Sequence, residues 1–241
     1  MLLKSKNKHK KDGEVVEHPN YGENHIYIIN GICHNHIGFK SVTTFIKDYF
    51  EEFNADKIIG LNYNKWQSDK DNIYYGKTPE EIKLIWDTNR DTRAEAGTYM
   101  HLQFENYLNG LEVDNIPEMA TLKRFLKERK LVPWRTEMSI YSDKWKIVGN
   151  VDLIVDNGDG TFDIYDWKRK KSVKDNSYSK KCKYPLNRLG DHEKNKYALQ
   201  LSVYKQIYEE HYIMKIKNLW NVLIEDDVCK VIKQKYIKLL K

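Results

Sequence analysis

Residues 149–171 read GNVDLIVDNGDGTFDIYDWKRKK, two runs rich in β-branched and aromatic residues around the turn-forming segment 157–160. This pattern predicts a β-hairpin centred on Asp159. Asp152 and Asp166 each lie seven residues from that centre, so they face each other with Cβ atoms about 4.5–5.5 Å apart. Lys168 follows Asp166 by two positions and points to the same face. The hairpin therefore brings two carboxylates and one ammonium together.

Two opposed carboxylates favour a nearby counter-charge, because neither ionises cheaply beside the other. A divalent cation can provide it, and hard oxygen ligands with open water positions suit Mg²⁺ or Mn²⁺. The Lys168 ammonium could then orient or help deprotonate an attacking water and offset charge on a phosphate. The alternative is a solvated hairpin with one Asp–Lys ion pair, and the hairpin alone leaves both interpretations open.

The segments around the hairpin alternate between helical and strand patterns. Helical periodicity is predicted for residues 41–53, 78–108 (with a break near Asn89), 117–130 and 197–211. Strands are predicted for residues 25–33, 132–141, 144–156, 161–167, 216–224 and 228–236, with a turn at Ser142 and Asp143. This order predicts an α/β (α+β) domain in which a central mixed β-sheet is flanked by helices.

Two of the predicted helices carry polar side chains at regular steps. Four-residue steps on the 78–108 helix place one stripe of residues, Arg93, Gly97, His101 and Glu105. A glycine inside a helix costs roughly 1 kcal/mol relative to alanine, so Gly97 suggests close approach by a backbone or a ligand. Gln200 and Tyr204 lie one turn apart on the 197–211 helix. An exposed His–Glu pair and an amphipathic core helix are the alternatives.

In combination these residues form an ordered series of motifs. The series is Gly97-x-x-x-His101-x-x-x-Glu105, Gly149-x-x-Asp152, Ile164-x-Asp166-Trp167-Lys168 and Gln200-x-x-x-Tyr204. It resembles the PD-(D/E)XK nuclease superfamily, and most closely the RecB-like exonuclease branch, over about residues 93–208. Asp152 follows a valine rather than a proline, which that branch permits.

The resemblance implies a restriction-endonuclease-like core and a division of the chain. Residues 1–24 would be a basic, flexible tail and residues 25–241 a single nuclease domain. Within that domain, residues 25–90 would form an N-terminal helical extension and residues 91–241 the catalytic core.

The resemblance also implies roles for individual residues. Mg²⁺ or Mn²⁺ would be bound by His101, Asp152, Asp166 and the Trp167 carbonyl. Lys168 would position or activate the attacking water, and Glu105 would support the metal shell or bind a second ion. Gln200 and Tyr204 would brace the site and the scissile phosphate. Glu137, on the preceding strand, is a weaker candidate for an outer position.

Charge is distributed unevenly along the 241 residues, whose net charge is +6. Residues 1–11 contribute +5 and residues 168–188 contribute +8, so the rest of the chain carries −7. This distribution favours a polyanion such as DNA as the partner, although residues 1–11 fit a solvated tail equally well. The candidate contacts to nucleic acid are Arg93, Lys170, Lys171, Lys174, Tyr178 and, unless it is a plain helix cap, Ser41. Tyr178 and Tyr184 are the better candidates for stacking on unpaired bases.

Composition excludes several other classes. No run of 18 apolar residues is present, and the first residues lack the apolar core of a secretory signal. The three cysteines are widely spaced, which disfavours a disulfide scaffold and leaves too few thiolates for a four-cysteine iron–sulfur cluster. The segment 33–36, Cys-His-Asn-His, matches no common zinc motif and is interpreted as a turn. An intracellular location, cytoplasm or nucleus, and no membrane association are expected.

The favoured function is therefore a metal-dependent DNA nuclease, with an exonuclease acting on linear or single-stranded ends as the first hypothesis. The alternatives are a non-catalytic nucleic-acid-binding module of the same fold, a structure-specific endonuclease, and a protein-interaction domain whose basic loop docks an acidic partner. A helicase or recombination partner is compatible with the sequence. Cleavage polarity, DNA against RNA preference and oligomeric state are left open.

Overall fold

The computed structural model describes residues 2–18, 26–34, 38–177 and 179–239. These residues form two compact units, one comprising Met1–Glu51 and Met100–Lys241 and the other Glu52–Tyr99. Helix α4 (Pro79–Leu108) begins in the second unit and ends in the first. Each unit is described separately below.

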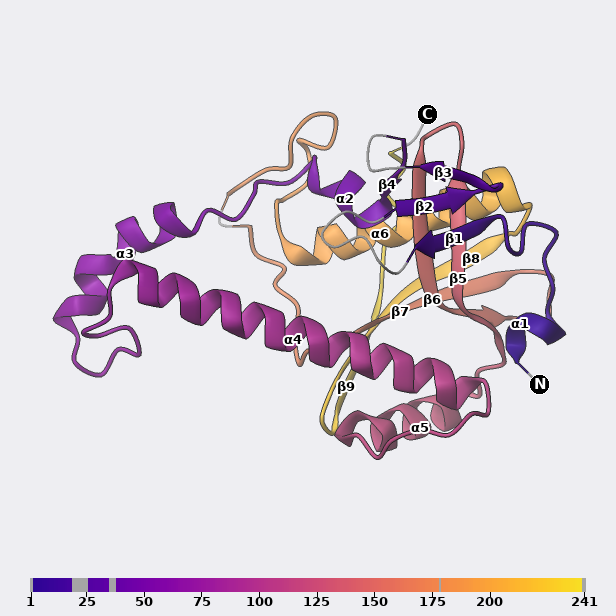
Figure 1. Cartoon of the computed structure of the whole chain (residues 1–241), viewed down its shortest axis with the longest axis horizontal. Helices are drawn as coiled ribbons and strands as arrows, with labels where there is room; N and C mark the ends of the chain where they lie inside the picture. Colours follow the sequence, from indigo (N-terminus) through magenta and orange to yellow (C-terminus); the bar gives the residue numbers. More distant parts are fainter. Residues whose placement is uncertain (1, 19–25, 35–37, 178, 240–241) are drawn as a thin grey trace. The chain divides into compact units, whose positions relative to one another are not determined.

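The first unit is built on a six-stranded sheet with the order β4-β6-β7-β8-β9, to which β5 is added by pairing with β6 (Figure 1). The strands are β4 (Lys40–Ser41), β5 (Pro133–Ser142), β6 (Ile147–Asp156), β7 (Phe162–Lys168), β8 (Ile216–Glu225) and β9 (Val228–Lys233). The β4–β6 and β7–β8 pairs are parallel and the others antiparallel. The sheet is therefore mixed.

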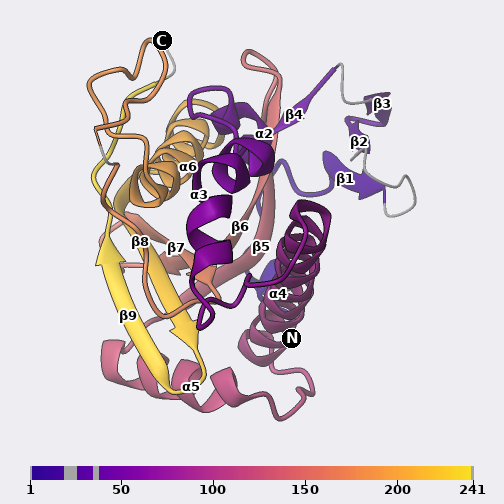
Figure 2. The same cartoon turned by 90° about the vertical axis from the view of Figure 1, so that its left-hand side faces the viewer.

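Helices cover both faces of this sheet. Side chains alternate along β6, so Ile154 joins one buried cluster while its neighbours Leu153 and Val155 join the other. The first cluster includes the apolar side of α6 (Glu193–Ile207), which continues into a π-helical turn, Tyr208–Tyr212, and that of α2 (Val42–Lys47). The second includes α5 (Pro117–Arg129) and the end of α4 (Figure 2). The predicted class, a central mixed sheet flanked by helices, is confirmed.

The β6–β7 hairpin has the predicted centre. Leu153 pairs with Tyr165, and the register continues to Asp156 and Phe162, so the hairpin is centred on Asp159. Turn side chains hold this register, because the Asp159 carboxylate accepts hydrogen bonds from the Thr161 amide (3.0 Å) and hydroxyl (2.5 Å). The next strand in the sheet, β8, runs parallel to β7, so the chain crosses over through the 169–192 loop and α6.

The N-terminal segment departs from the expected irregular structure. Within residues 1–24 the structure has α1 (Leu3–Lys6) and β1 (Val15–His18), which pairs with β2 (Ile26–Ile29). The predicted 25–33 strand is instead a hairpin of β2 and β3 (Ile32–His34) around Asn30 and Gly31, both at positive φ. Cys33 and His34 thus belong to a strand rather than a turn, and residues 35–37 lie outside the described residues.

Specific contacts hold residues 2–15 against the rest of the first unit. The amide of Leu3 donates to Asn109 Oδ1 (2.8 Å), and the guanidinium of Arg135 donates through Nη1 to both Asp12 carboxylate oxygens (2.9 and 3.0 Å). Arg135 is 3% exposed, so its charge needs this carboxylate. The lysine-rich composition of residues 1–11 did not predict this contact, because Asp12 and Arg135 are 123 residues apart in the sequence.

The second unit contains α3 (Ala55–Ser68) and the first part of α4. The sequence analysis left residues 54–76 without a helix, and it therefore missed α3 as well as α1. Thr78 and Glu81 form a capping box at the start of α4, in which each backbone amide donates to the other side chain (2.7 and 3.2 Å). Helix α4 then runs for 30 residues without the expected break near Asn89. The helix predicted over 41–53 is shorter than expected, because α2 ends at Lys47.

No helix in the part of the chain that the structure describes is long and apolar enough to cross a lipid bilayer.

Candidate metal centre

The last turns of α4 place His101 and Glu105 at the end of the sheet. Met100 and Phe104, each one residue earlier, are buried in the second cluster, where the Phe104 ring packs edge-on against Trp167 (centroids 5.5 Å apart). This packing fixes the rotation of the helix. As a result, Nε2 of His101 lies 3.2 Å from the Trp167 carbonyl oxygen.

His101 also faces two carboxylates. Its Nδ1 lies 3.5 Å from Asp152 Oδ2 and 3.8 Å from Glu137 Oε1, and ligand atoms of these three residues all lie within 4.8 Å of one another. Because a carbonyl can only accept, Nε2 carries a proton and Nδ1 faces the acids. Burial lowers the pKa of His101, but the charges of Asp152 and Glu137 outweigh burial and raise that pKa to about 9. The ring is therefore an imidazolium at neutral pH, and it supplies the positive charge that balances the two carboxylates.

Asp152 lies at the point where the β6–β7 ladder ends, one position beyond the last pair, Leu153 with Tyr165. Its Oδ2 accepts a hydrogen bond from the Trp167 amide (2.7 Å). Burial raises the pKa of Asp152 to about 7, an effect that His101 opposes and the charge of Asp166 reinforces. The carboxylate is thus held rigidly among groups that would stabilise it better with a cation present.

Glu137 reaches the cluster from β5. Thr136 pairs with Leu153 and Met138 with Val151, so Glu137 lies opposite Asp152. Its φ of +42° is in the left-handed region, where a residue with a side chain is strained by about 1–3 kcal/mol. Such strain persists where the surrounding structure requires it. The sequence analysis gave Glu137 only an outer position, whereas the structure places its carboxylate inside the group.

Asp166 lies outside this three-residue group and belongs to a neighbouring network of hydrogen-bonded polar side chains. Its carboxylate pairs with the Lys168 ammonium (2.8 Å) and accepts a hydrogen bond from the Asn221 amide (2.7 Å). Gln234 in turn donates to Asn221 Oδ1 (2.8 Å). Asn221 and Gln234 were not among the sequence candidates, since their positions depend on the pairing of β7 with β8 and of β8 with β9.

Lys168 connects this network of polar side chains to α6. Its Nζ lies 3.5 Å from Gln200 Oε1, and Gln200 donates through Nε2 to the Tyr204 hydroxyl (3.0 Å). Burial lowers the pKa of Lys168, but the charges of Asp166 and Asp152 prevail and raise it above its usual value. The side chain therefore stays an ammonium at neutral pH, which favours positioning of an anion or a water over deprotonation.

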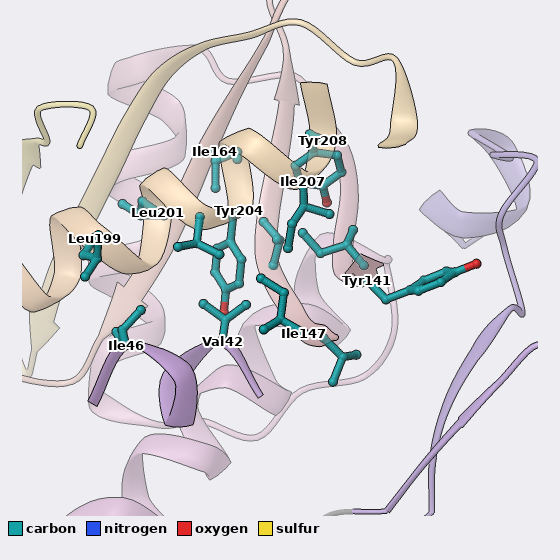
Figure 3. Close-up of a cluster of buried hydrophobic side chains, with 14 of the residues drawn as sticks. Val42, Ile46, Tyr141, Ile147, Ile164, Leu199, Leu201, Tyr204, Ile207 and Tyr208 are labelled. Carbon is teal, nitrogen blue, oxygen red and sulfur yellow. The ribbon is translucent and has the colours of Figure 1, made fainter. Parts of the chain in front are cut away.

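The Tyr204 ring lies close to the backbone of β6. Figure 3 shows it pointing from α6 toward Val42, among the buried apolar residues of the first cluster. A Cβ built on Gly149 would lie 2.6 Å from Tyr204 Cε1 and 3.2 Å from Val42 Cγ2. Position 149 therefore requires glycine, because any side chain there would collide with the Tyr204 ring.

Glu105 lies beside the group rather than in it. Burial and the charge of Glu137 raise the pKa of Glu105. Both glutamates line a cavity of about 300 Å³, whose lining also includes Lys4, Lys11 and Arg135. The N-terminal segment thus supplies part of the wall of a cavity that reaches the cluster.

The residues predicted to contact nucleic acid are placed differently. Lys170 pairs with Glu193 and Lys171 with Asp226, whereas Lys174 is exposed. Ser41 caps α2, accepting a hydrogen bond from the Thr44 amide (3.0 Å). Arg93 is exposed on the part of α4 that belongs to the second unit, and Tyr178 lies outside the described residues. Gly97 has no described atom within 4 Å of the position of a Cβ, so the expected close backbone approach is not found.

The spacing of these groups along the chain matches a known family. A family model of the PD-(D/E)XK nuclease superfamily matches residues 73–234, which include the three cluster residues, Lys168 and Tyr204. The chain belongs to the PD-(D/E)XK nuclease superfamily. Among solved structures, the one described as "Crystal structure of SSO0001" is 17% identical, covers 81% of this chain and 78% of that chain, and has a TM-score of 0.30. No curated protein matches this chain.

Members of this superfamily are metal-dependent nucleases, and DNA is the substrate that the family suggests. The group of His101, Glu137 and Asp152 is a candidate site for a divalent cation.

Proposed function

We propose that this chain is a metal-dependent deoxyribonuclease of the RecB-like branch, acting as an exonuclease on linear or single-stranded DNA ends. The observation that carries the nuclease proposal is the position of Lys168. This protonated, half-buried lysine is held by Asp166, and the charges of Asp166 and Asp152 together raise its pKa. The exonuclease proposal is supported by the order of the motif residues in the sequence.

The residues present fit a divalent cation. His101, Glu137 and Asp152 offer one imidazole nitrogen and two carboxylates within 4.8 Å of one another. Crowding of negative charge raises the pKa of His101 to about 9, so a cation is favoured among these groups. Two carboxylates suit Mg²⁺ or Mn²⁺, and the imidazole makes Mn²⁺ the better match. When bound, such a cation polarises a phosphoryl oxygen, lowers the pKa of a water and stabilises the leaving oxygen.

The protein's own residues would bind and orient the scissile phosphate. Lys168 donates hydrogen bonds to a phosphate oxygen or to the attacking water, and its charge offsets that of the phosphate. Asp166 keeps the ammonium in place and is itself fixed by Asn221. On the α6 side, Gln200 restricts the position of the Lys168 ammonium, and Tyr204 holds Gln200 through a hydrogen bond. We include Asp166 as a further ligand and Glu105 as support for a second ion within this proposal.

A cleavage assay tests the proposal. End-labelled linear single- and double-stranded DNA and a closed circle are incubated with the protein in Mg²⁺, Mn²⁺ or EDTA, beside the Lys168→Ala and Asp152→Asn variants. Metal-dependent loss of linear DNA, with the circle intact and cleavage by both variants strongly reduced, is expected. A cut circle would instead indicate an endonuclease. Binding without cleavage in any metal would indicate a nucleic-acid-binding module of the same fold.

A further inference from the structure

The basic segment between β7 and α6 has two parts with different ionic surroundings. Near the sheet each basic residue has an acidic partner: Arg169 with Glu118, Lys170 with Glu193, and Lys171 with Asp226. Farther along, Lys181, Lys183 and Arg188 are exposed and form no ion pair among the described residues. Lys180 pairs with Glu51. Of the four basic side chains in this segment that form no ion pair among the described residues, one is Lys174 and the other three lie at residues 181–188.

Tyr184 lies in the middle of this charged part. Its side chain is 84% exposed, the highest value among the exposed large hydrophobic side chains of the described residues. A tyrosine ring carries a large apolar surface that folded proteins usually bury in part. Such a ring, with these three cations within four residues of it in the sequence, is well suited to stacking on a base while the cations contact phosphates.

The loop presents this ring because of its own packing. Cys182 and Leu186, on either side of Tyr184, are 3% and 2% exposed and belong to the first buried cluster. The Lys183 amide donates to the Tyr49 carbonyl (2.8 Å), and the Cys182 amide donates to the Leu189 carbonyl (3.0 Å). Two buried anchors and these backbone bonds fix the loop, so the exposure of Tyr184 is a property of the folded unit.

The loop is close to the candidate active site along the chain. It leaves β7 at Lys168 and enters α6 at Glu193 (Figure 1). Gln200 follows Glu193 by seven residues, which is about 10 Å along a helix. The loop therefore joins the strand that carries Lys168 to the helix that carries Gln200.

We infer that Tyr184, with Lys181, Lys183 and Arg188, forms a binding surface for an unpaired DNA strand. The ring stacks on one base, and the cations contact the flanking phosphates. Bases in a duplex are already stacked, so the ring discriminates in favour of single strands while the cations do not. This inference rests on the proposed function, because it identifies the substrate of that site as a strand with unpaired bases.

Binding measured without cleavage tests the surface. The fluorescence anisotropy of a labelled oligothymidylate and of a labelled blunt duplex is measured in EDTA with the full chain. Tyr184→Ala is expected to weaken oligothymidylate binding about tenfold and to leave duplex binding unchanged, while Tyr184→Phe retains both. Lys183→Gln is expected to weaken the binding of both probes. It should also reduce the slope of log affinity against log salt concentration by about one, because one phosphate contact is lost. Tyr75→Ala, which removes another exposed tyrosine (43%), is the matched control and is expected to bind like the parent.

Each result has a distinct meaning. Unchanged oligothymidylate binding by Tyr184→Ala, or an equal loss of affinity for duplex and single strand, would contradict the inference that Tyr184 binds unpaired bases. Metal-dependent cleavage by the parent protein, assayed separately, decides the proposed function. A parent that binds through Tyr184 but cleaves no DNA would contradict the proposed nuclease and leave the surface intact. A parent that binds neither probe at low salt would overturn both.

Discussion

Tyr204 occupies the space in which a side chain at Gly149 would lie, since a Cβ there would be 2.6 Å from Tyr204 Cε1. The two residues are 55 positions apart in the sequence. Each belongs to a different motif of the family series. The glycine of one motif is therefore required by the tyrosine of another, and the hydrogen bond from Gln200 to the Tyr204 hydroxyl depends on both.

Gly149→Ala is expected to displace the Tyr204 ring and with it Gln200 and Lys168. Overpacking of this kind costs about 1–3 kcal/mol in the free energy of unfolding, and cleavage should fall more than stability accounts for. Urea denaturation and cleavage rates measure the two effects. Gly97→Ala is the control, since that position is open and helical, and it should be neutral or stabilising by up to about 1 kcal/mol. Equal behaviour of the two variants would show that the contact has no consequence.

Lys168→Ala is expected to lower the cleavage rate by about 10²–10³, the typical effect of removing one charged donor from the reacting group. Cation binding should survive, because Lys168 is not a member of the three-residue group. Mn²⁺ binding measured by calorimetry, beside the cleavage rate, separates these effects. Loss of Mn²⁺ binding in this variant would mean that the lysine acts through the structure of the metal centre.

Glu137→Gln is expected to weaken Mn²⁺ binding by more than about tenfold, a loss that even an outer partner of a metal site can cause. Glu105→Gln should weaken it less, because Glu105 lies outside the group. Titration of both variants with Mn²⁺ makes the comparison. Stronger dependence on Glu105 than on Glu137 would exclude the geometry described here.

Stability without a cation should fall as the pH rises. The pKa of His101 is raised to about 9, so its stabilising contribution is complete below about 6.5 and is lost as the pH passes through 9. The raised pKa of Asp152, about 7, acts in the same direction between about pH 4 and pH 7, because the folded state again binds more protons than the unfolded state. Thermal unfolding in EDTA from pH 6 to pH 9 measures the slope. His101→Gln should flatten it above pH 6.5, and an unchanged slope in that variant would contradict the assignment.

Asp12→Ala is expected to destabilise the first unit by about 1–3 kcal/mol, because it leaves the buried Arg135 guanidinium without its carboxylate. Asp143→Ala removes an exposed i,i+3 ion pair with Lys146 and should cost at most about 0.5 kcal/mol. Urea denaturation at neutral pH compares the two. Similar small losses would mean that the N-terminal segment contributes little to stability.

Local sequence signals predicted the parts of this structure that depend on neighbouring residues. The Asn-Gly-Asp-Gly turn located the β6–β7 hairpin, and helical periodicity placed the start of α4 within one residue. In both cases the determining groups lie within a few residues of one another. The signal is therefore contained in a short stretch of sequence.

Glu137 shows why other parts could not be predicted. The expected turn at Ser142 and Asp143 would have given a different β5–β6 register, whereas β5 extends to Ser142 and β6 begins at Ile147. The four intervening residues shift the partner of Asp152 to Glu137. A turn of this length has no sharp sequence signal. The pairing of Arg135 with Asp12 and of Lys171 with Asp226 likewise depends on tertiary structure rather than on local sequence.

The crossover between β7 and α6 has a consequence for how this family can diversify. Lys168 ends the strand and Gln200 lies within the helix, and each is held by its own element rather than by the 169–192 loop that joins them. Changes in the length or composition of that loop would therefore leave the catalytic geometry intact while altering which polymers approach it. Exchange of this loop between members of the superfamily would therefore change the surface around the candidate site and leave the positions of Lys168 and Gln200 unchanged.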